Sequence, residues 1–157
     1  MRRIRESYPA MTKHFLYTAC LTYVQQRINT AVEAMRAAQE SANSESKSSA
    51  GDKYETGRAM AQLDRDRHAQ LLADARRMMQ ELEQLDLAPA ILIRPGSLAK
   101  TDRGTFFISI SAGRISLEGH DYMAVSAASP IGAALRGKRV GEVAVFNKIR
   151  YVVEGVE

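Results

Sequence analysis

The sequence predicts an α+β fold: an antiparallel helical hairpin, followed by a small antiparallel β-rich domain with one short helix. Three observations support this prediction. Apolar residues recur every three or four positions in the first half, as on a helix, and alternate with polar residues in the second half, as on strands. A serine-rich segment divides the helical half into two arms, and Pro89 ends it. We therefore expect a helical domain over residues 1–88 and a β-rich domain over residues 89–157.

The first expected arm has the apolar spacing of a coiled-coil seam, with steps that alternate between three and four residues. Ala, Gln, Glu and Arg, which favour helices, fill the remaining positions. Pro9 suits the entry to this helix, because the first helical turn needs no N–H donor there. The seam positions are Tyr17, Leu21, Val24, Ile28, Ala31, Met35, Ala38 and Ala42.

The pattern breaks over residues 41–51, where Ser, Asn and Gly favour a turn. A second seam follows, with Asp64 as a defect that favours a hairpin packed on itself over an extended parallel dimer. Each arm has about 35 residues, or roughly 50 Å of helix. A short turn between arms of equal length predicts antiparallel packing, and we expect a monomer. The second seam comprises Tyr54, Gly57, Ala61, His68, Leu71, Ala75, Met78, Leu82 and Leu85.

After Pro89 the period of two predicts short strands. The expected strands cover residues 91–93, 105–111, 114–118 and 122–126, then a last hairpin of residues 140–146 and 149–153. We expect one tight turn at Ala112-Gly113 and another at Asn147-Lys148. A short helix is expected over residues 129–136, with Ser129 as N-cap, Pro130 at the first helical position and Gly137 after the end.

Composition narrows the functional classes. The net charge of +4 divides into 13 Lys+Arg against 12 Asp+Glu in residues 1–88, and 9 against 6 in residues 89–157. This excess is too small to predict nucleic-acid binding. The single cysteine, Cys20, excludes an intramolecular disulfide and fits a reducing compartment. Since no apolar run approaches a membrane span and no signal peptide is evident, we expect a cytoplasmic protein with no membrane partner.

Two segments resemble the Gre transcript cleavage factors. Gly51-Asp-Lys-Tyr-Glu55 is similar to the Gly-Asp-x-x-Glu signature at the hairpin tip of that family. Ser129-Pro-Ile-Gly-Ala-Ala-Leu-Arg-Gly-Lys-Arg-Val-Gly-Glu142 is similar to the family stretch Ser-Pro-Ile-(Gly/Ala)-x-Ala-Leu-x-Gly-Lys-x-x-Gly-(Asp/Glu). The resemblance covers roughly residues 13–157, with the parts in the family's order.

The resemblance implies an FKBP-like C-terminal domain that docks at the rim of the secondary channel of bacterial RNA polymerase. The hairpin would enter the channel, where Asp52 and Glu55 would act as catalytic and metal-binding acids. They would hold Mg²⁺ jointly with the polymerase, and none in the isolated protein. Such a protein is an elongation factor, not an enzyme: it stimulates cleavage of backtracked RNA by the polymerase and meets the RNA 3′ end and DNA only within the elongation complex. The implied polymerase-binding residues are Ser129, Pro130, Ile131, Lys138 and Arg139.

The chemistry of the two acids fits this role. Asp52 and Glu55 are three residues apart and share a helix face, and carboxylate oxygens are ligands for Mg²⁺. The same spacing also fits a capping box with Asp52 as N-cap, so both roles stay open. The chain departs from the family after Glu55, where Thr56-Gly57-Arg58-Ala59 replaces the family's Asn-Ala-Glu-Tyr. Within a helix, glycine costs about 1 kcal/mol relative to alanine, and Arg58 places a positive charge beside the acids.

Three alternatives stay open. The departure at Thr56-Gly57-Arg58 favours a channel-binding regulator that does not stimulate cleavage. An FKBP-like domain also allows a peptidyl-prolyl isomerase, which needs an aromatic-lined apolar pocket. A coiled-coil adaptor with no polymerase role is the third. The aromatic residues available to an isomerase are Phe106, Phe107, Tyr122, Phe146 and Tyr151.

Overall fold

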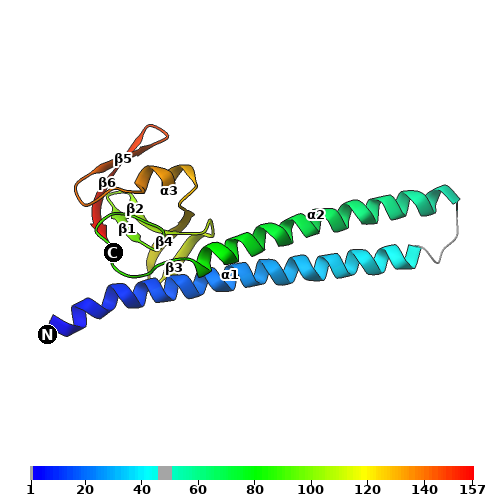
Figure 1. The fold of residues 1–157 in the computed structure, drawn as a ribbon, viewed down its shortest axis with the longest axis horizontal. Helices are drawn as coiled ribbons and strands as arrows, with labels where there is room; N and C mark the ends of the chain where they lie inside the picture. Colours follow the sequence, from blue (N-terminus) through cyan, green and yellow to red (C-terminus); the bar gives the residue numbers. More distant parts are fainter. Residues whose placement is uncertain (1, 46–50) are drawn as a thin grey trace. The chain divides into compact units, whose positions relative to one another are not determined.

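Figure 1 shows the computed structural model, which describes residues 2–45 and 51–157, and the side chains of residues 11–44 and 55–157. A helical hairpin is followed by a small, largely antiparallel β domain with one short helix, so the predicted architecture is confirmed. The chain divides into two compact units. One, the hairpin unit, comprises Tyr23–Met79, and the other comprises Met1–Thr22 together with Gln80–Glu157. The expected boundary between residues 88 and 89 stays a prediction. The elements are α1 (Arg2–Glu45), α2 (Gly51–Glu83), β1 (Leu98–Thr101), β2 (Gly104–Ser109), β3 (Gly113–Leu117), β4 (His120–Ser126), α3 (Pro130–Leu135), β5 (Val143–Phe146) and β6 (Ile149–Val156).

Both ends of α1 differ from the expectation. The helix begins at Arg2, so Pro9 lies inside it and the helix lacks one backbone N–H donor there. At the other end, residues 41–45 are helical although the expected turn begins at residue 41. Serine and asparagine are only moderately unfavourable in a helix, which explains the extension. Gly51 begins α2, and the rest of the expected turn, residues 46–50, lies outside the described residues.

The hairpin unit packs through small apolar side chains. Val24 and Ala31 of α1 are buried at their predicted seam positions, as is Ala75 of α2. In the described part of α2 the seam differs at Leu71, which is 43% exposed while its neighbour Leu72 is buried; the predicted seam residue Tyr54 lies outside the described side chains. In a straight helix the face that a strict heptad repeat occupies rotates slowly around the helix axis. Beyond the defect at Asp64, the residue of α2 that is buried is therefore Leu72 instead of the predicted Leu71.

Local interactions stabilise the part of the hairpin nearer the tip. From Glu55 to Leu71 no α2 side chain is buried, and Met60 and Leu63 are well exposed. Along α1, Arg36 pairs with Glu33 and, at 2.9 Å, with Glu40. Pairs at this spacing stabilise a helix without tertiary packing.

The β domain contains one six-stranded sheet, in the order β3-β4-β2-β1-β6-β5. β2 and β4 run parallel, and the other neighbouring strands run antiparallel. The predicted last hairpin is confirmed: Phe146 pairs with Ile149 across the turn, where Asn147 and Lys148 have φ values of 51° and 64°. Two successive positive φ values are what a type I′ turn requires.

Two predictions about strands are wrong. No hairpin turn forms at Ala112-Gly113, because β3 pairs with β4 around Glu118-Gly119, while β2 pairs in parallel with β4. β2 is buried on both faces and therefore takes a central place in the sheet, with a partner on each side. Residues 91–93 form no strand, and the first strand is instead β1.

The two faces of the sheet have different neighbours. Phe106 and Ile108 of β2 pack in a core with Leu135 of α3. Alternate residues of a strand face opposite sides, and on the other side Ser109 Oγ lies 3.8 Å from Cys20 Sγ of α1. Cys20 is fully buried, and burial raises the pKa of its thiol, which fits the predicted packing role.

Lys13 is buried in the same unit as Cys20, on α1, with only 2% of its surface exposed. Its Nζ donates a hydrogen bond to the Leu87 carbonyl oxygen at 3.1 Å. Burial lowers the pKa of the Lys13 ammonium, and attraction by Glu157 opposes that effect. Lys13 thus ties α1 to the segment that follows α2.

Candidate functional site

The two expected tip acids lie at the start of α2. Asp52 and Glu55 belong to its first turns, so their spacing places both positions on one helix face. Glu55 is exposed to solvent, whereas the side chain of Asp52 lies outside the described residues. The capping role and the metal-binding role of Asp52 therefore stay predictions.

Carboxylates are the expected metal ligands at this end of the hairpin. Carboxylate oxygens are hard ligands that match Mg²⁺, and the exposure of Glu55 lets it join ligands from another molecule. Among the residues with described side chains, no three His, Cys, Asp or Glu residues are grouped closely enough to hold a metal ion.

A polar hollow of about 360 Å³ lies between the arms, on the tip side of the hairpin unit. Arg58 and Arg65 of α2 line it together with Gln39 and Asn43 of α1. Arg65 Nη1 donates a hydrogen bond to Gln39 Oε1 at 2.9 Å, which links the arms directly. Arg58 follows Glu55 by one helical turn, so the positive charge predicted beside the acids is present.

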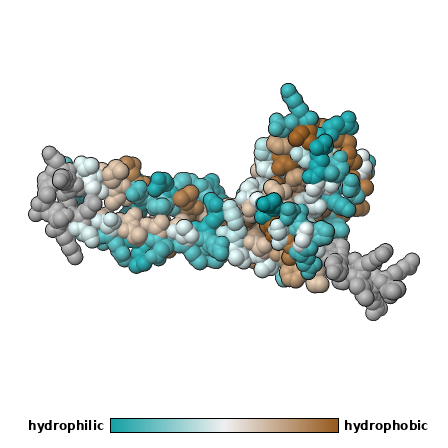
Figure 2. Space-filling view, turned by 180° about the vertical axis from the view of Figure 1, so that it is seen from behind, coloured by the Kyte–Doolittle hydropathy of each residue, from teal (hydrophilic) through white to brown (hydrophobic). Residues whose placement is uncertain are grey.

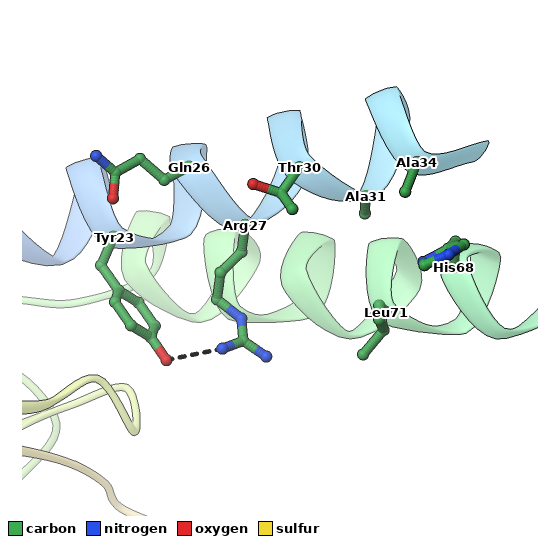
Figure 3. Close-up of a pocket in the computed structure, with 8 residues that line it drawn as sticks. All are labelled: Tyr23, Gln26, Arg27, Thr30, Ala31, Ala34, His68 and Leu71. Carbon is green, nitrogen blue, oxygen red and sulfur yellow. Dashed lines mark hydrogen bonds between the residues drawn. The ribbon is translucent and has the colours of Figure 1, made fainter. Parts of the chain in front are cut away.

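A second hollow, of about 400 Å³, lies farther along the arms (Figure 3). Arg27 Nη1 donates a hydrogen bond to Tyr23 Oη at 3.0 Å, and the guanidinium carbon lies 5.4 Å from the centre of the Tyr23 ring. His68 lines the same hollow beside Ala31 and Leu71. His68 is half-buried at its predicted seam position.

In the β domain, three of the predicted polymerase-binding residues lie at the start of α3. Ser129 Oγ accepts a hydrogen bond from Gly132 N–H at 3.1 Å, which confirms the predicted N-cap. Ile131 is partly buried and packs against the core. Pro130, at the first helical position, is exposed. Of these three, Pro130 presents the most surface to a partner.

The other two predicted residues follow the end of α3, where Gly137 has a φ of 80° as expected after a helix C-terminus. Lys138 accepts a hydrogen bond from Ile93 N–H at 2.8 Å through its backbone carbonyl. Arg139 lies 3.5 Å from Glu142 in an ion pair and borders an open groove with Arg136. The structure therefore divides the five predicted residues between the two ends of α3.

Sequence reasoning missed the other wall of this groove. Ile91 and Leu92 line it, although they were assigned to a strand. A signal was present: residues 91–93 are only three residues long and lie between Pro89 and Arg94-Pro95-Gly96, which is typical of a loop.

Two of the five aromatic residues available to a peptidyl-prolyl isomerase are buried in the β domain. Phe106 and Phe107 are buried in the domain. The Phe106 and Tyr151 rings pack edge to face, with centres 5.9 Å apart. No aromatic residue lines the groove beside α3.

None of the described helices has the length and apolar character of a membrane span.

Comparison with known proteins gives limited matches. No family model matches the chain, and no curated protein matches it. Among solved structures, the chain is similar to GreA factor homolog 1 (Gfh1) of Thermus thermophilus, with 19% identity over 85% of this chain and 92% of that chain, at a TM-score of 0.35. It is also similar to a structure of the transcription factor Gfh1, with 20% identity over 88% of this chain and 93% of that chain, at a TM-score of 0.30.

Proposed function

We propose that this chain is a Gre-type transcription factor that binds bacterial RNA polymerase through the secondary channel and stimulates cleavage of backtracked RNA. One observation carries the proposal: the Gly-Asp-x-x-Glu segment begins the second arm of a helical hairpin. The second motif supports it, since Ser129 caps the short helix Pro130–Leu135 within the β-rich part of the chain.

The hairpin suits delivery of acids into a narrow channel. Within the hairpin unit, α1 runs from Tyr23 to Glu45 and α2 from Gly51 to Met79. At 1.5 Å per residue these arms measure roughly 35 and 45 Å. A pair of helices is only about 20 Å wide, so Asp52 and Glu55 can reach a site that a globular domain cannot enter.

The roles of the residues follow from this position. Glu55, and Asp52 beside it on the helix face, would supply carboxylate oxygens to a Mg²⁺ that the polymerase also holds. A divalent cation at such a site stabilises the attacking and leaving oxygens of phosphodiester hydrolysis. The α2 backbone fixes the separation between the acids, and Arg58 reduces the negative charge around them.

The test is cleavage of RNA in stalled, backtracked elongation complexes. Wild-type protein should shorten the RNA from its 3′ end, and the double substitution Asp52→Ala with Glu55→Ala should abolish this effect. Asp64→Ala with Asp66→Ala removes the same charge from the same helix and should leave cleavage intact. Equal cleavage with the tip variant and wild type would refute the assigned role of the acids.

The second candidate is a channel-binding regulator without cleavage-stimulating activity. Its support is local: Gly57 lies within α2, where glycine is unfavourable, and Arg58 lies one turn from Glu55. Such a protein would bind polymerase but release no short RNA. The triple substitution Thr56→Asn, Gly57→Ala and Arg58→Glu restores three of the four family residues after Glu55, so cleavage that appears only in this variant would identify wild type as the regulator.

A further inference from the structure

One side of the hairpin unit combines an exposed apolar side chain with an apolar hollow. Met60 of α2 is 58% exposed, and Leu63, about one turn farther along, is 64% exposed. The hollow of about 400 Å³ in Figure 3 has apolar surface from Leu71 of α2 and from Ala31 and Ala34 of α1. Figure 2 shows hydrophobic patches, in brown, among hydrophilic ones on the surface of the two arms. Apolar side chains beside a hollow are typical of a surface that docks a helix.

Met60 and this hollow lie on the same face of α2. Leu71, which lines the hollow, follows Met60 by eleven residues, which is close to three complete helical turns. The two positions are therefore about 16 Å apart along one face of the helix. Because one position protrudes and the other borders a hollow, an antiparallel second copy of the hairpin would place its own Met60 in this hollow and receive the first Met60 in return.

The charges between these two positions are self-complementary. Asp64 and Arg67 lie on the same face of α2 and form an exposed ion pair at 3.5 Å. The midpoint of Met60 and Leu71, between residues 65 and 66, is also the midpoint of Asp64 and Arg67. A two-fold axis at this point sets Met60 of each copy against Leu71 of the other. It also sets Asp64 of each copy against Arg67 of the other, which is the match that an isologous interface requires.

This pattern favours a second copy over other occupants. Nucleic acid binds to an excess of positive charge, whereas Asp64 balances Arg67 in the middle of this face. The sequence predicts a monomer, because Asp64 interrupts the seam and disfavours an extended parallel dimer. Antiparallel packing of two finished hairpins is a different arrangement, in which Asp64 becomes a contact residue.

We propose that two copies of this chain associate through their hairpin units, with the α2 helices antiparallel. Met60 of each copy fills the hollow of the other, because a flexible methionine side chain adapts to an irregular cavity. Asp64 and Arg67 set the register, since exposed ion pairs add little stability but misaligned like charges repel. The inference does not depend on the proposed function.

The test is sedimentation equilibrium of the full-length chain. Contact over about three helical turns predicts a weak dimer, so the protein is studied up to about 1 mM. Wild type should show a monomer–dimer equilibrium, and Met60→Glu should raise the dissociation constant at least tenfold. Val32→Glu is the matched control: Val32 is 46% exposed, but it lies more than half a turn from Thr30 and Ala34, which line the hollow. The control should stay within twofold of wild type, and circular dichroism verifies that each variant is folded.

Charge reversal distinguishes a contact between copies from a role within one helix. Asp64→Arg and Arg67→Asp each place like charges opposite one another in the proposed dimer, so each variant alone should dimerise at least tenfold more weakly. An equimolar mixture of the two should form heterodimers, because the two positive side chains of one variant then face the two negative side chains of the other. Mixing cannot restore an ion pair that acts only within one α2 helix.

Three results would overturn the inference. Wild type could remain a monomer over the whole concentration range, or a dimer could persist unchanged in Met60→Glu and in both charge variants. The mixture could also fail to associate, which would exclude the antiparallel register. A monomeric wild type whose Met60→Glu variant binds core RNA polymerase more weakly would assign this face to the polymerase instead. The proposed function, which depends on Asp52 and Glu55, is tested separately by RNA cleavage.

Discussion

Replacing Gly96 with alanine tests the packing of the segment that carries the groove. Gly96 has a φ of 97°, and its N–H donates to the Ile108 carbonyl at 2.7 Å. A Cβ at this position would lie 2.8 Å from the carbonyl carbon of Asp86 and closer still to its oxygen. Both are backbone atoms, so no side-chain rotation can relieve the overlap.

The expected loss of stability has two parts. A left-handed backbone conformation costs an L-residue about 1–2 kcal/mol. Forcing an additional carbon into a packed site costs about 1–3 kcal/mol. Alanine also lowers the entropy of the unfolded chain, which offsets about 0.4–1 kcal/mol. We therefore expect Gly96→Ala to lower the free energy of unfolding by about 3 kcal/mol.

Two other glycines serve as controls that separate these parts. Gly104 has a φ of 124° but open space where a Cβ would stand, so Gly104→Ala should show only the conformational loss. Gly155 has an ordinary backbone, and its nearest neighbour, Lys100 Cβ, would be 3.6 Å away, so Gly155→Ala should be close to neutral. Urea unfolding followed by tyrosine fluorescence measures all three. If Gly96→Ala loses no more stability than Gly104→Ala, the close approach to Asp86 does not constrain this segment.

Three further predictions follow from single side chains. Ser129→Ala removes the N-cap of α3 and should lower the free energy of unfolding by about 1 kcal/mol in urea, whereas Ser129→Asp should retain most of it. Burial lowers the pKa of Lys13 below the ordinary 10.5, although attraction by Glu157 opposes this shift. At pH values between the lowered pKa and 10.5, Lys13 therefore binds fewer protons in the folded state than in the unfolded state. The free energy of unfolding should therefore rise with pH in this window, and Lys13→Met should remove the rise in urea titrations at successive pH values. Cys20 should react with a thiol reagent far more slowly in the folded protein than in urea; equal rates would contradict its burial.

Signals that act over a few residues predicted the structure well. The N-cap Ser129, Pro130 after it and Gly137 beyond the end locate α3 because capping depends only on neighbouring backbone groups. The last hairpin was also located correctly, since a two-residue loop at Asn147-Lys148 fixes the pairing of its strands. The α1 seam was predicted only in part: Val24 and Ala31 are buried at seam positions, but nearer the N-terminus Leu16 and Cys20 are buried, and the predicted Tyr17 and Leu21 are only half-buried.

Pairing between distant strands could not be predicted in this way. The parallel contact of β2 with β4 joins residues that are not neighbours in the chain, and no local pattern specifies it. Glu118-Gly119 did offer a local signal for the β3–β4 turn, since a polar residue followed by glycine favours positive φ. Since Gly113 and Gly119 both lie at strand boundaries, local signals do not decide which of the two turns joins paired strands.

The candidate site shows the same division. Asp52 and Glu55 were placed near a hairpin tip by periodicity alone, because a break between two helical seams locates the turn. The groove could not be located, because residues 91–93 have one buried and two exposed apolar side chains, and hydropathy does not distinguish them. Ile93 is held by the loop after α3, which lies more than forty residues farther along the chain. That contact leaves Ile91 and Leu92 at the surface beside arginine side chains. A groove built from such distant contacts forms only once the β domain has folded.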